Sequence, residues 1–556
     1  MKTFDDVLAS IGDFGTYQKR LYAFCVIPNM LTASLTLITV FTLNEHHHSC
    51  QIPEVPINST HDLSTLQYVN SSRDVSILFG NHSNGSHNQE ALQCHISSCN
   101  ETSNMTSQTK CTKWEYSTDE MSKTPISDFD LVCDNVVLRS HASMVFFGGT
   151  LVGVILAGML GDVVGRKPVM VIGVFTLTIS SMACVWSYNY QMFLVTRFLT
   201  GLSSLMVFAP CMLIPMEMVG PTKRVFVGII IELLWCIGEV VLCGLAYFIR
   251  DWRTLQLVLA IPCVLLLAYT VIIPESPRWL LLVGRRKQAM QILRKIAKVN
   301  GTTLTGEITE VCRESGSLRD ILTLLKKPKL VLRWTIVSFI WFAISLSYYG
   351  LILNAGRIGG NIYLNFLVSA IVEALGYSSC LVINDRFGRK IMNCGSLVLT
   401  GVACLSTILT TQLGGESLSW FTITLSMIGK FGVSAAFGNI FIYTSELFPT
   451  SSRSFILSSS NIFARIGSLI SPYIADLSLL VDSMFGKALP LIIFGCLGLS
   501  AGLVSLVLPE TLNATLPDTI NDILSADDKD SKRTWKHYHN DQDNDAMLGM
   551  PLRSSS

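Results

Sequence analysis

Long apolar runs separated by short polar segments dominate this chain of 556 residues. A helix that crosses a bilayer needs about 20 consecutive apolar residues. Half of the residues are hydrophobic and only 15% are charged, which is the composition of a polytopic membrane protein. We therefore predict an all-α membrane protein with twelve transmembrane helices, at 21–43, 141–160, 168–188, 191–213, 226–248, 254–273, 332–354, 362–383, 391–411, 418–444, 454–476 and 488–508.

Short polar signatures repeat between these runs at nearly one spacing. Segment 158–167 reads Gly-Met-Leu-Gly-Asp-Val-Val-Gly-Arg-Lys, and segment 384–390 reads Asn-Asp-Arg-Phe-Gly-Arg-Lys. Two more pairs keep a similar offset, namely 216–224 with 445–453 and 273–277 with 508–511. Such matches indicate that one six-helix half has been duplicated. Duplicated halves that rock about a central site are typical of secondary transporters.

Lysine and arginine in the short loops set the orientation, because cytosolic loops carry the excess of these residues. The basic loops all fall on one side, so we expect both termini to be cytosolic. The predicted parts are a cytosolic N-terminus (1–20), a first half (21–273), a cytosolic central loop (274–331), a second half (332–508) and a disordered cytosolic tail (509–556).

Segment 44–138 is then extracellular, and its composition agrees. It is crowded with glycosylation sequons, which we expect to be used, at Asn58, Asn70, Asn81, Asn84, Asn100 and Asn104. The sequons at Asn300 and Asn513 fall on the cytosolic side and are expected to be bare. The segment also holds a cluster of cysteines that predicts disulfides, without fixing their pairing: Cys50, Cys94, Cys99, Cys111 and Cys133.

Several of these segments resemble a known family. Segment 158–167 resembles the signature loop of the major facilitator superfamily. The large loop between the first two runs, segment 274–279 (Pro-Glu-Ser-Pro-Arg-Trp) and segment 446–450 (Glu-Leu-Phe-Pro-Thr) resemble the organic cation/anion/zwitterion transporter family of solute carriers. Segment 359–365 (Gly-Gly-Asn-Ile-Tyr-Leu-Asn) is similar to the carnitine and organic cation/carnitine members. The resemblance implies the major facilitator fold and transport of small organic ions.

Charged residues inside the apolar runs are the main candidates for substrate binding. Each costs a few kcal/mol at the bilayer centre, so it normally faces a partner or a wet cavity. Glu232, Trp235 and Glu239 are spaced i, i+3, i+7 and share one helix face. An indole attracts a quaternary ammonium and the carboxylates neutralise it. Arg465 in the eleventh run is suited to hold a substrate carboxylate in a bidentate pair.

Further candidates complete this set, and their charges bear on the substrate. They are Glu373 in the eighth run, Lys430 and Phe441 in the tenth, and Tyr348 in the seventh. In the transporter family that the sequence resembles, anion and zwitterion carriers have a basic residue in the eleventh span. Typical cation carriers of that family have an acidic residue there. Arg465 therefore favours a zwitterion such as carnitine. The alternative that Glu239, Glu373 and Arg465 only neutralise one another as structural pairs stays open.

The repeated signature residues predict a gating latch on the cytosolic side. Basic residues near helix ends can pair with acidic residues of the neighbouring half, and such a network breaks and reforms when the halves move. The alternative is that these residues only set the topology. The predicted latch consists of Asp162, Arg166, Glu217 and Arg224 in the first half, and Asp385, Arg389, Glu446 and Arg453 in the second.

The amino-acid sequence therefore predicts a plasma-membrane secondary transporter that works by alternating access. Its partners would be a small organic ion, the lipid bilayer, and a coupled sodium ion, proton or counter-substrate. An organic anion exchanger and a non-transporting receptor or scaffold of the same fold are the alternatives. We expect no enzyme activity, because there is no phosphate-binding loop, no His-Glu-x-x-His motif and no recognisable catalytic triad. We also expect no cofactor, resident metal or nucleic-acid partner.

Overall fold

The computed structural model describes residues 4–44, 47–51, 94–100, 105–304, 318–357, 359–414, 418–449, 452–480 and 484–512. Within these ranges, eleven helices are long and apolar enough to cross a membrane. The expected span 454–476 corresponds to a further helix of 28 residues, which is less apolar because serines, Arg465 and Asp476 interrupt it. The prediction of an all-α membrane protein is confirmed.

The first half is built from helices that follow the apolar runs closely. Its sixth expected span is divided into an α-helix, a 3₁₀ turn and a final α-helical turn. Its elements are α1 (Phe4–Ile11), α2 (Thr16–Leu37), α3 (Thr39–Thr42), α7 (Val136–Val163), α8 (Arg166–Val185), α9 (Tyr190–Glu217), α10 (Pro221–Phe248), α11 (Trp252–Leu265), η2 (Leu266–Ala268) and α12 (Tyr269–Ile272).

The second half repeats this arrangement, and shorter helices of the central loop connect the two. The second half contains α16 (Pro328–Asn354), α17 (Ile362–Phe387), α18 (Arg389–Gly414), α19 (Ser419–Leu447), α20 (Arg453–Leu480) and α21 (Met484–Ser505). The central loop contains α13 (Pro277–Leu282), α14 (Arg286–Asn300) and α15 (Leu318–Leu325).

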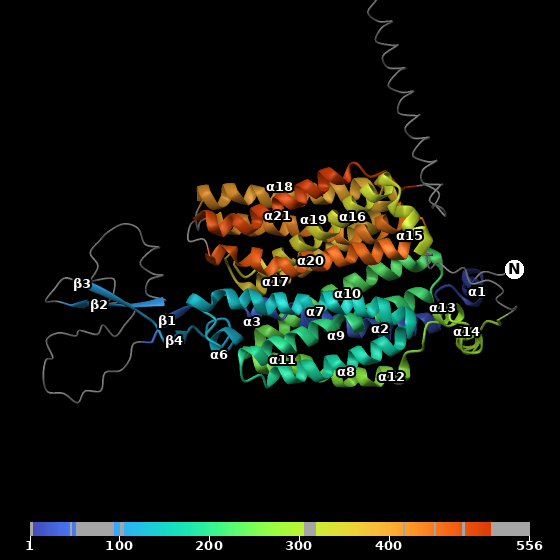
Figure 1. The fold of residues 1–556 in the computed structure, drawn as a ribbon, viewed down its shortest axis with the longest axis horizontal. Helices are drawn as coiled ribbons and strands as arrows, with labels where there is room; N and C mark the ends of the chain where they lie inside the picture. The colour runs from blue at the N-terminus through green and yellow to red at the C-terminus, as the bar shows by residue number, and fades with distance from the viewer. Residues whose placement is uncertain are drawn as a thin grey trace, which may run out of the picture.

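The two halves lie side by side, with their long helices running along the same direction (Figure 1). Two helix pairs join them, because α7 packs against α20 and α10 packs against α17. We call the end where α7 begins, next to the β strands, the disulfide end. The opposite end, which carries segments 158–167 and 384–390, is the motif end.

A small β region and two disulfides mark the disulfide end. Strand β1 (His48–Cys50) pairs antiparallel with β4 (Trp114–Tyr116), and β2 (His95–Asn100) pairs antiparallel with β3 (Met105–Lys110). The short helices α6 (Pro125–Asp128) and η1 (Cys133–Asn135) lead from the strands into α7.

The disulfides are Cys50–Cys111 and Cys94–Cys133. The structure thus pairs four of the five predicted cysteines, while the side chain of Cys99 lies outside the described residues. Of the predicted glycosylation sites, Asn100 is described only in its backbone, and the other five lie outside the described residues.

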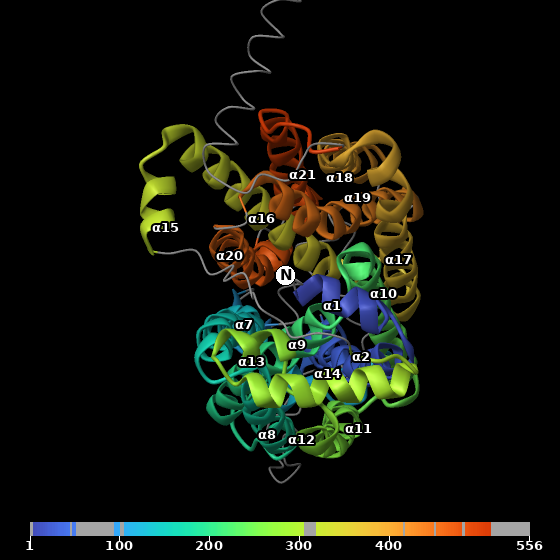
Figure 2. The same cartoon turned by 90° about the vertical axis from the view of Figure 1, so that its right-hand side faces the viewer.

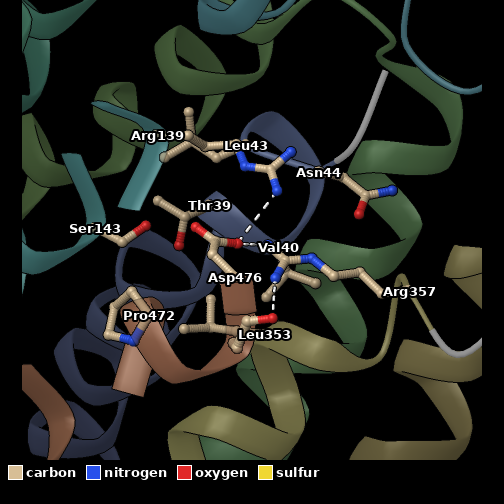
Figure 3. A pocket seen from close by; sticks show the side chains of 11 residues that line it. Thr39, Val40, Leu43, Asn44, Arg139, Ser143, Leu353, Arg357, Pro472 and Asp476 are labelled. Atoms are coloured by element: carbon tan, nitrogen blue, oxygen red, sulfur yellow. Dashed lines mark hydrogen bonds and ion pairs between the residues drawn. The ribbon is translucent and has the colours of Figure 1, made fainter. Parts of the chain in front are cut away.

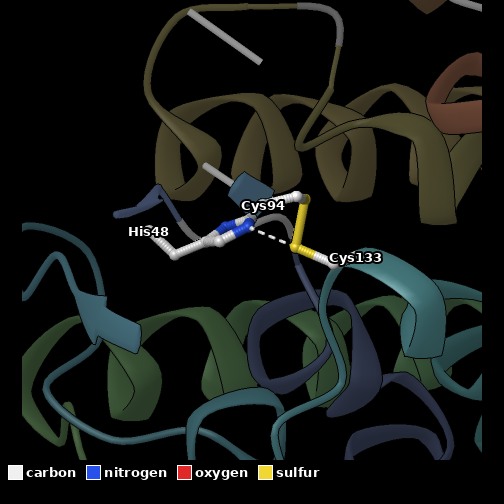
Figure 4. A group of neighbouring side chains, drawn as sticks. All are labelled: His48, Cys94 and Cys133. Atoms are coloured by element: carbon white, nitrogen blue, oxygen red, sulfur yellow. Dashed lines mark hydrogen bonds between the residues drawn. A yellow bond between two sulfur atoms is a disulfide. The ribbon is translucent and has the colours of Figure 1, made fainter. Parts of the chain in front are cut away.

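His48 lies beside the second disulfide, with its Nε2 atom 3.8 Å from Cys133 Sγ (Figure 4). Together with Cys94 these side chains are close enough to suggest a metal site. Both sulfur atoms are consumed in the disulfide, however, and a metal needs the thiolate form as its ligand. The cluster is therefore a disulfide with a histidine packed against it.

Helix α14 lies across the motif end of the first half (Figure 2). It is amphipathic and buries Ala289, Leu293 and Ile296. At its end, the Asn300 amide donates to Ile11 O (2.9 Å) and Gln18 Oε1 (3.0 Å), while its oxygen accepts from Tyr17 N (3.0 Å). The nitrogen to which a glycan would attach is thus used to hold the N-terminal helices.

The repeated signatures of the motif end have a shared structural role. Glu275 accepts hydrogen bonds from the backbone N–H groups of Arg166 (3.1 Å) and Lys167 (3.2 Å). These residues begin α8, so the carboxylate satisfies donors that a helix start leaves open. Glu510 does the same for Arg389 (2.9 Å) and Lys390 (3.1 Å) at the start of α18. The Pro-Glu repeat therefore caps the Gly-Arg-Lys repeat in each half.

Glycine is required where these caps form. Gly165 has φ +117° and Gly388 has φ +94°, a backbone conformation that L-residues with a Cβ rarely adopt. A Cβ at either position would also meet a capping carboxylate oxygen at 2.4 Å, that of Glu275 or Glu510. Two independent constraints thus act on each glycine.

We predict that Gly165→Ala and Gly388→Ala each destabilise the protein by about 1–3 kcal/mol, because both strain the backbone and displace the cap. The measurement is the Tm of purified protein in detergent. Gly158→Ala and Gly395→Ala are matched controls, since a Cβ there meets nothing within 4 Å. The controls should keep or raise the Tm. Equal Tm values in all four variants would show that the caps tolerate a Cβ.

Candidate functional site

A buried ion pair lies at the middle of the second half. Lys430 on α19 places its Nζ atom 2.6 Å from Glu373 Oε2 on α17, and both side chains are at most 2% exposed. Tyr348 on α16 donates to the other carboxylate oxygen at 2.5 Å. The ammonium also lies 3.5 Å from the centroid of the Tyr348 ring. These added contacts largely compensate the free-energy cost of removing the two charges from water.

Glu239 brings a second carboxylate to this pair from the other half. It lies on α10 and is 1% exposed. Trp235, one turn before it, donates its indole N–H to Glu239 Oε1 at 3.1 Å. Glu239 interacts electrostatically with both Glu373 and Lys430. Two carboxylates, one from each half, therefore lie near a single lysine where the halves meet.

Arg465 on α20 is near the same cluster, because it interacts electrostatically with Tyr349 and with Glu232 on α10. Its buried Nε atom has no hydrogen-bond partner. The open question of the sequence analysis, whether Glu239, Glu373 and Arg465 neutralise one another, is thus answered for Glu373. Its direct partner is Lys430.

Aromatic rings form a continuous row beside the charges. Phe441 contacts Trp341 with ring centroids 4.5 Å apart, and Phe437 lies between Phe441 (5.8 Å) and Tyr348 (5.2 Å). The predicted pair of Tyr348 and Phe441 is therefore joined through Phe437. The row continues from Tyr348 to Tyr349 and then to Phe147 of the first half, 4.9 Å away. Such faces suit the apolar body of an organic cation.

At the motif end the predicted latch residues pair, but within each half. Arg166 lies 3.2 Å from Asp162 and 3.4 Å from Glu217. In the second half, Arg389 lies 3.1 Å from Glu446. The sequence analysis expected partners across the halves; in this conformation the ion pairs of Arg166 and Arg389 lie within their own half, and the latch across the halves stays a prediction.

The reason why these arginines pair within their own half is local. Each arginine begins a helix and folds back onto the end of the preceding one, so that Arg166 donates to Gly161 O (2.8 Å) and Arg389 to Asn384 O (3.1 Å). Asp385 is exposed. The side chain of Arg224 lies outside the described residues.

At the disulfide end a cluster that the sequence analysis missed does join the halves. Asp476 on α20 forms ion pairs with Arg139 of α7 at 3.2 Å and with Arg357, and it accepts a hydrogen bond from Ser140 (Figure 3). A small cavity lies beside it, lined by residues of both halves. The sequence does contain one sign of this cluster, because Asp476 is an acidic residue at the end of an apolar run. Its arginine partners are too distant in sequence to be assigned from the sequence.

We predict that Lys430→Ala destabilises the protein by about 3–5 kcal/mol, because it leaves Glu373 charged and buried without a partner. The double variant Lys430→Ala with Glu373→Ala should recover most of that loss. The measurement is a double-mutant cycle on the Tm of purified protein, with Tyr348→Phe as a variant that keeps both charges and loses one hydrogen bond. Additive losses in the double variant would mean that the two residues act independently.

Known proteins resemble this chain over most of its length. A family model described as "Sugar (and other) transporter" matches residues 91–521. The organic cation transporter protein of Drosophila melanogaster is 33% identical over 93% of this chain and 94% of its own. The human organic cation/carnitine transporter 2 is 30% identical over 97% of both. Rat solute carrier family 22 member 3 is 30% identical over 94% of this chain and 96% of its own.

A solved structure supports the fold. The xylose transporter XylE from E. coli, in a partially occluded inward open conformation, matches with a TM-score of 0.59 and 15% identity over 89% of this chain and 99% of its own. Matching helices in both halves agree with the duplicated architecture described above. The chain belongs to the sugar (and other) transporter family, within its solute carrier branch of organic ion carriers, and is a secondary transporter.

Proposed function

We propose that this transporter carries a small organic cation or a zwitterion such as carnitine across the plasma membrane, with both termini in the cytosol. The observation that carries the proposal is Glu239, a buried carboxylate of the first half that faces the Lys430–Glu373 pair of the second. The names of relatives among organic cation and carnitine transporters support the same substrate class.

In the proposed mechanism the cationic end of the substrate binds between the halves. Glu239 supplies the countercharge and the indole of Trp235 supplies an aromatic face. Lys430 already neutralises Glu373, so the carboxylate of Glu239 is the one left for the substrate. Because the site draws residues from both halves, a rocking motion exposes it to each side of the membrane in turn.

Arg465 distinguishes a zwitterion from a simple cation in this proposal. Its planar guanidinium offers a fork for a carboxylate, and its Nε atom is buried without a hydrogen-bond partner. A substrate with both charges would span the distance between α10 and α20.

An organic anion exchanger is the second candidate, and Arg465 is again its supporting observation. The neutralisation of Lys430 by Glu373 argues against it, because Arg465 is then the cation left for a pure anion, and Glu232 already interacts with it electrostatically. A receptor that has lost transport is disfavoured, since buried charges at mid-membrane are costly to keep without a use.

We predict that Glu239→Gln cuts uptake of a quaternary ammonium such as tetraethylammonium, lowering apparent affinity roughly a hundredfold. Arg465→Lys should instead weaken carnitine and simple carboxylates, since it keeps the charge but loses the planar fork. Uptake of the three substrates into proteoliposomes, with and without sodium, is the measurement. Arg197→Lys is the matched control, because Arg197 is buried on α9 over the Phe146 ring, 4.5 Å from its centroid.

Uniform loss of all three substrates in both variants, with protein missing from the membrane, would overturn the assignment. The charges would then be structural. Unchanged selectivity at normal expression would also contradict it.

The proposed orientation makes a separate prediction. Glycosidase treatment should lower the apparent mass, and Asn300→Gln should leave that shift unchanged, because Asn300 lies on the proposed cytosolic side. The same variant should lower the Tm, since it removes hydrogen bonds to Ile11 and Tyr17. A glycan on Asn300 in the wild-type chain would reverse the orientation.

A further inference from the structure

The Asp476 cluster of the disulfide end joins two arginines from different halves to one carboxylate. Two guanidinium groups, from Arg139 and Arg357, converge on one carboxylate (Figure 3). The side chains of all three residues are at most 10% exposed. One carboxylate of the second half therefore holds two arginines in a poorly solvated place.

The charges are divided unequally between the halves. Arg139 belongs to α7 of the first half, whereas Asp476 and Arg357 belong to the second. Arg357 also donates to the backbone oxygen of Ala475, one residue before Asp476. When the halves of this transporter part at the disulfide end, Asp476 keeps Arg357, and Arg139 loses the ion-pair partner that it has here.

The environment of Arg139 makes the loss of its ion-pair partner unfavourable in free energy. The residue is 4% exposed, and its buried Nε atom already lacks a hydrogen-bond partner. It lies in the first turn of α7, where the helix macrodipole is positive and which itself contains no acidic residue. A buried charge that loses its partner costs several kcal/mol. Opening is therefore favoured by any ligand that supplies a negative charge to Arg139.

We propose that Arg139 is the centre of an anion-binding site, occupied when the disulfide end opens, in which a small monovalent anion takes over from Asp476. The ligand is a carboxylate or chloride. The cavity beside Arg139 is lined by the hydroxyls of Thr39 and Ser143, which are donors suited to either ion. The source is the carboxylate end of a substrate or the chloride of the medium.

The site also couples anion binding to conformation. An anion that binds only the open state raises the population of that state, in proportion to its differential affinity. The site is distinct from the central one, because Arg139 and Asp476 lie at the end of the bundle. Its test needs no knowledge of the transported substrate, so it can fail independently of the proposed function.

The test uses Ser143→Cys as a reporter, because Ser143 lines the cavity and is 5% exposed in the closed arrangement. The full chain in lipid nanodiscs is labelled with a maleimide, and the same protein without the substitution gives the background from native cysteines. Chloride is titrated into a buffer whose anion is the bulky 2-(N-morpholino)ethanesulfonate. Acetate is titrated in a second series.

The expected result is a saturable rise in labelling rate, about threefold to tenfold, with chloride, acetate or both. A response to chloride alone identifies the ion of the medium as the ligand. A response to acetate identifies a carboxylate. Arg139→Gln should label fast at every anion concentration. Arg357→Gln should label slowly and need more anion, because Asp476 then binds Arg139 alone.

Arg139→Lys provides a variant that keeps the charge. It should retain the chloride response and weaken the acetate response, since lysine lacks the planar fork. Labelling that is independent of both anions in the reporter protein would overturn the proposal. A full anion response that persists in Arg139→Gln would overturn it as well.

Discussion

The need to compensate charge in a medium of low dielectric governs the interior of this protein. Lys430 and Glu373 are almost fully buried, and each would be costly without the other. Among the described residues, Glu239 forms no ion pair within its own half and interacts with that pair across the boundary between the halves. The charge balance of one half therefore depends on the position of the other, which is the coupling that the proposed substrate site requires.

The duplication provides the rigid frame that this coupling needs. In both halves a glutamate caps the helix that begins with Arg-Lys, and a glycine with positive φ allows the close approach. The arginine that follows pairs with a glutamate of its own half. These contacts hold helices of one half to each other, so they are compatible with each half moving as a unit.

The two ends of the bundle consequently differ in what their ion pairs do. At the motif end the described pairs stabilise each half internally. At the disulfide end Arg139 and Asp476 join the halves, as do Tyr363 of α17, which donates to Glu120 O, and Cys243 of α10, which donates to Tyr363 O. The structure is thus held closed at the disulfide end by contacts that a change of state must break.

The amino-acid sequence by itself determined the helices, the duplication and the residues that bear charge inside the membrane. These features depend on local composition and on the length needed to cross a bilayer, which an apolar run reports directly. Tertiary structure alone decided which charges meet. Arg139 and Asp476 are 337 residues apart in the sequence. Glu373 forms its ion pair with Lys430 and not with Arg465. Which charges pair depends on how helices from distant segments are rotated and packed against one another. The spacing of residues along one helix does not determine that packing. The hydrogen bonds from Arg166 and Arg389 to the end of the preceding helix were decided in the same way, because they are a property of the folded turn.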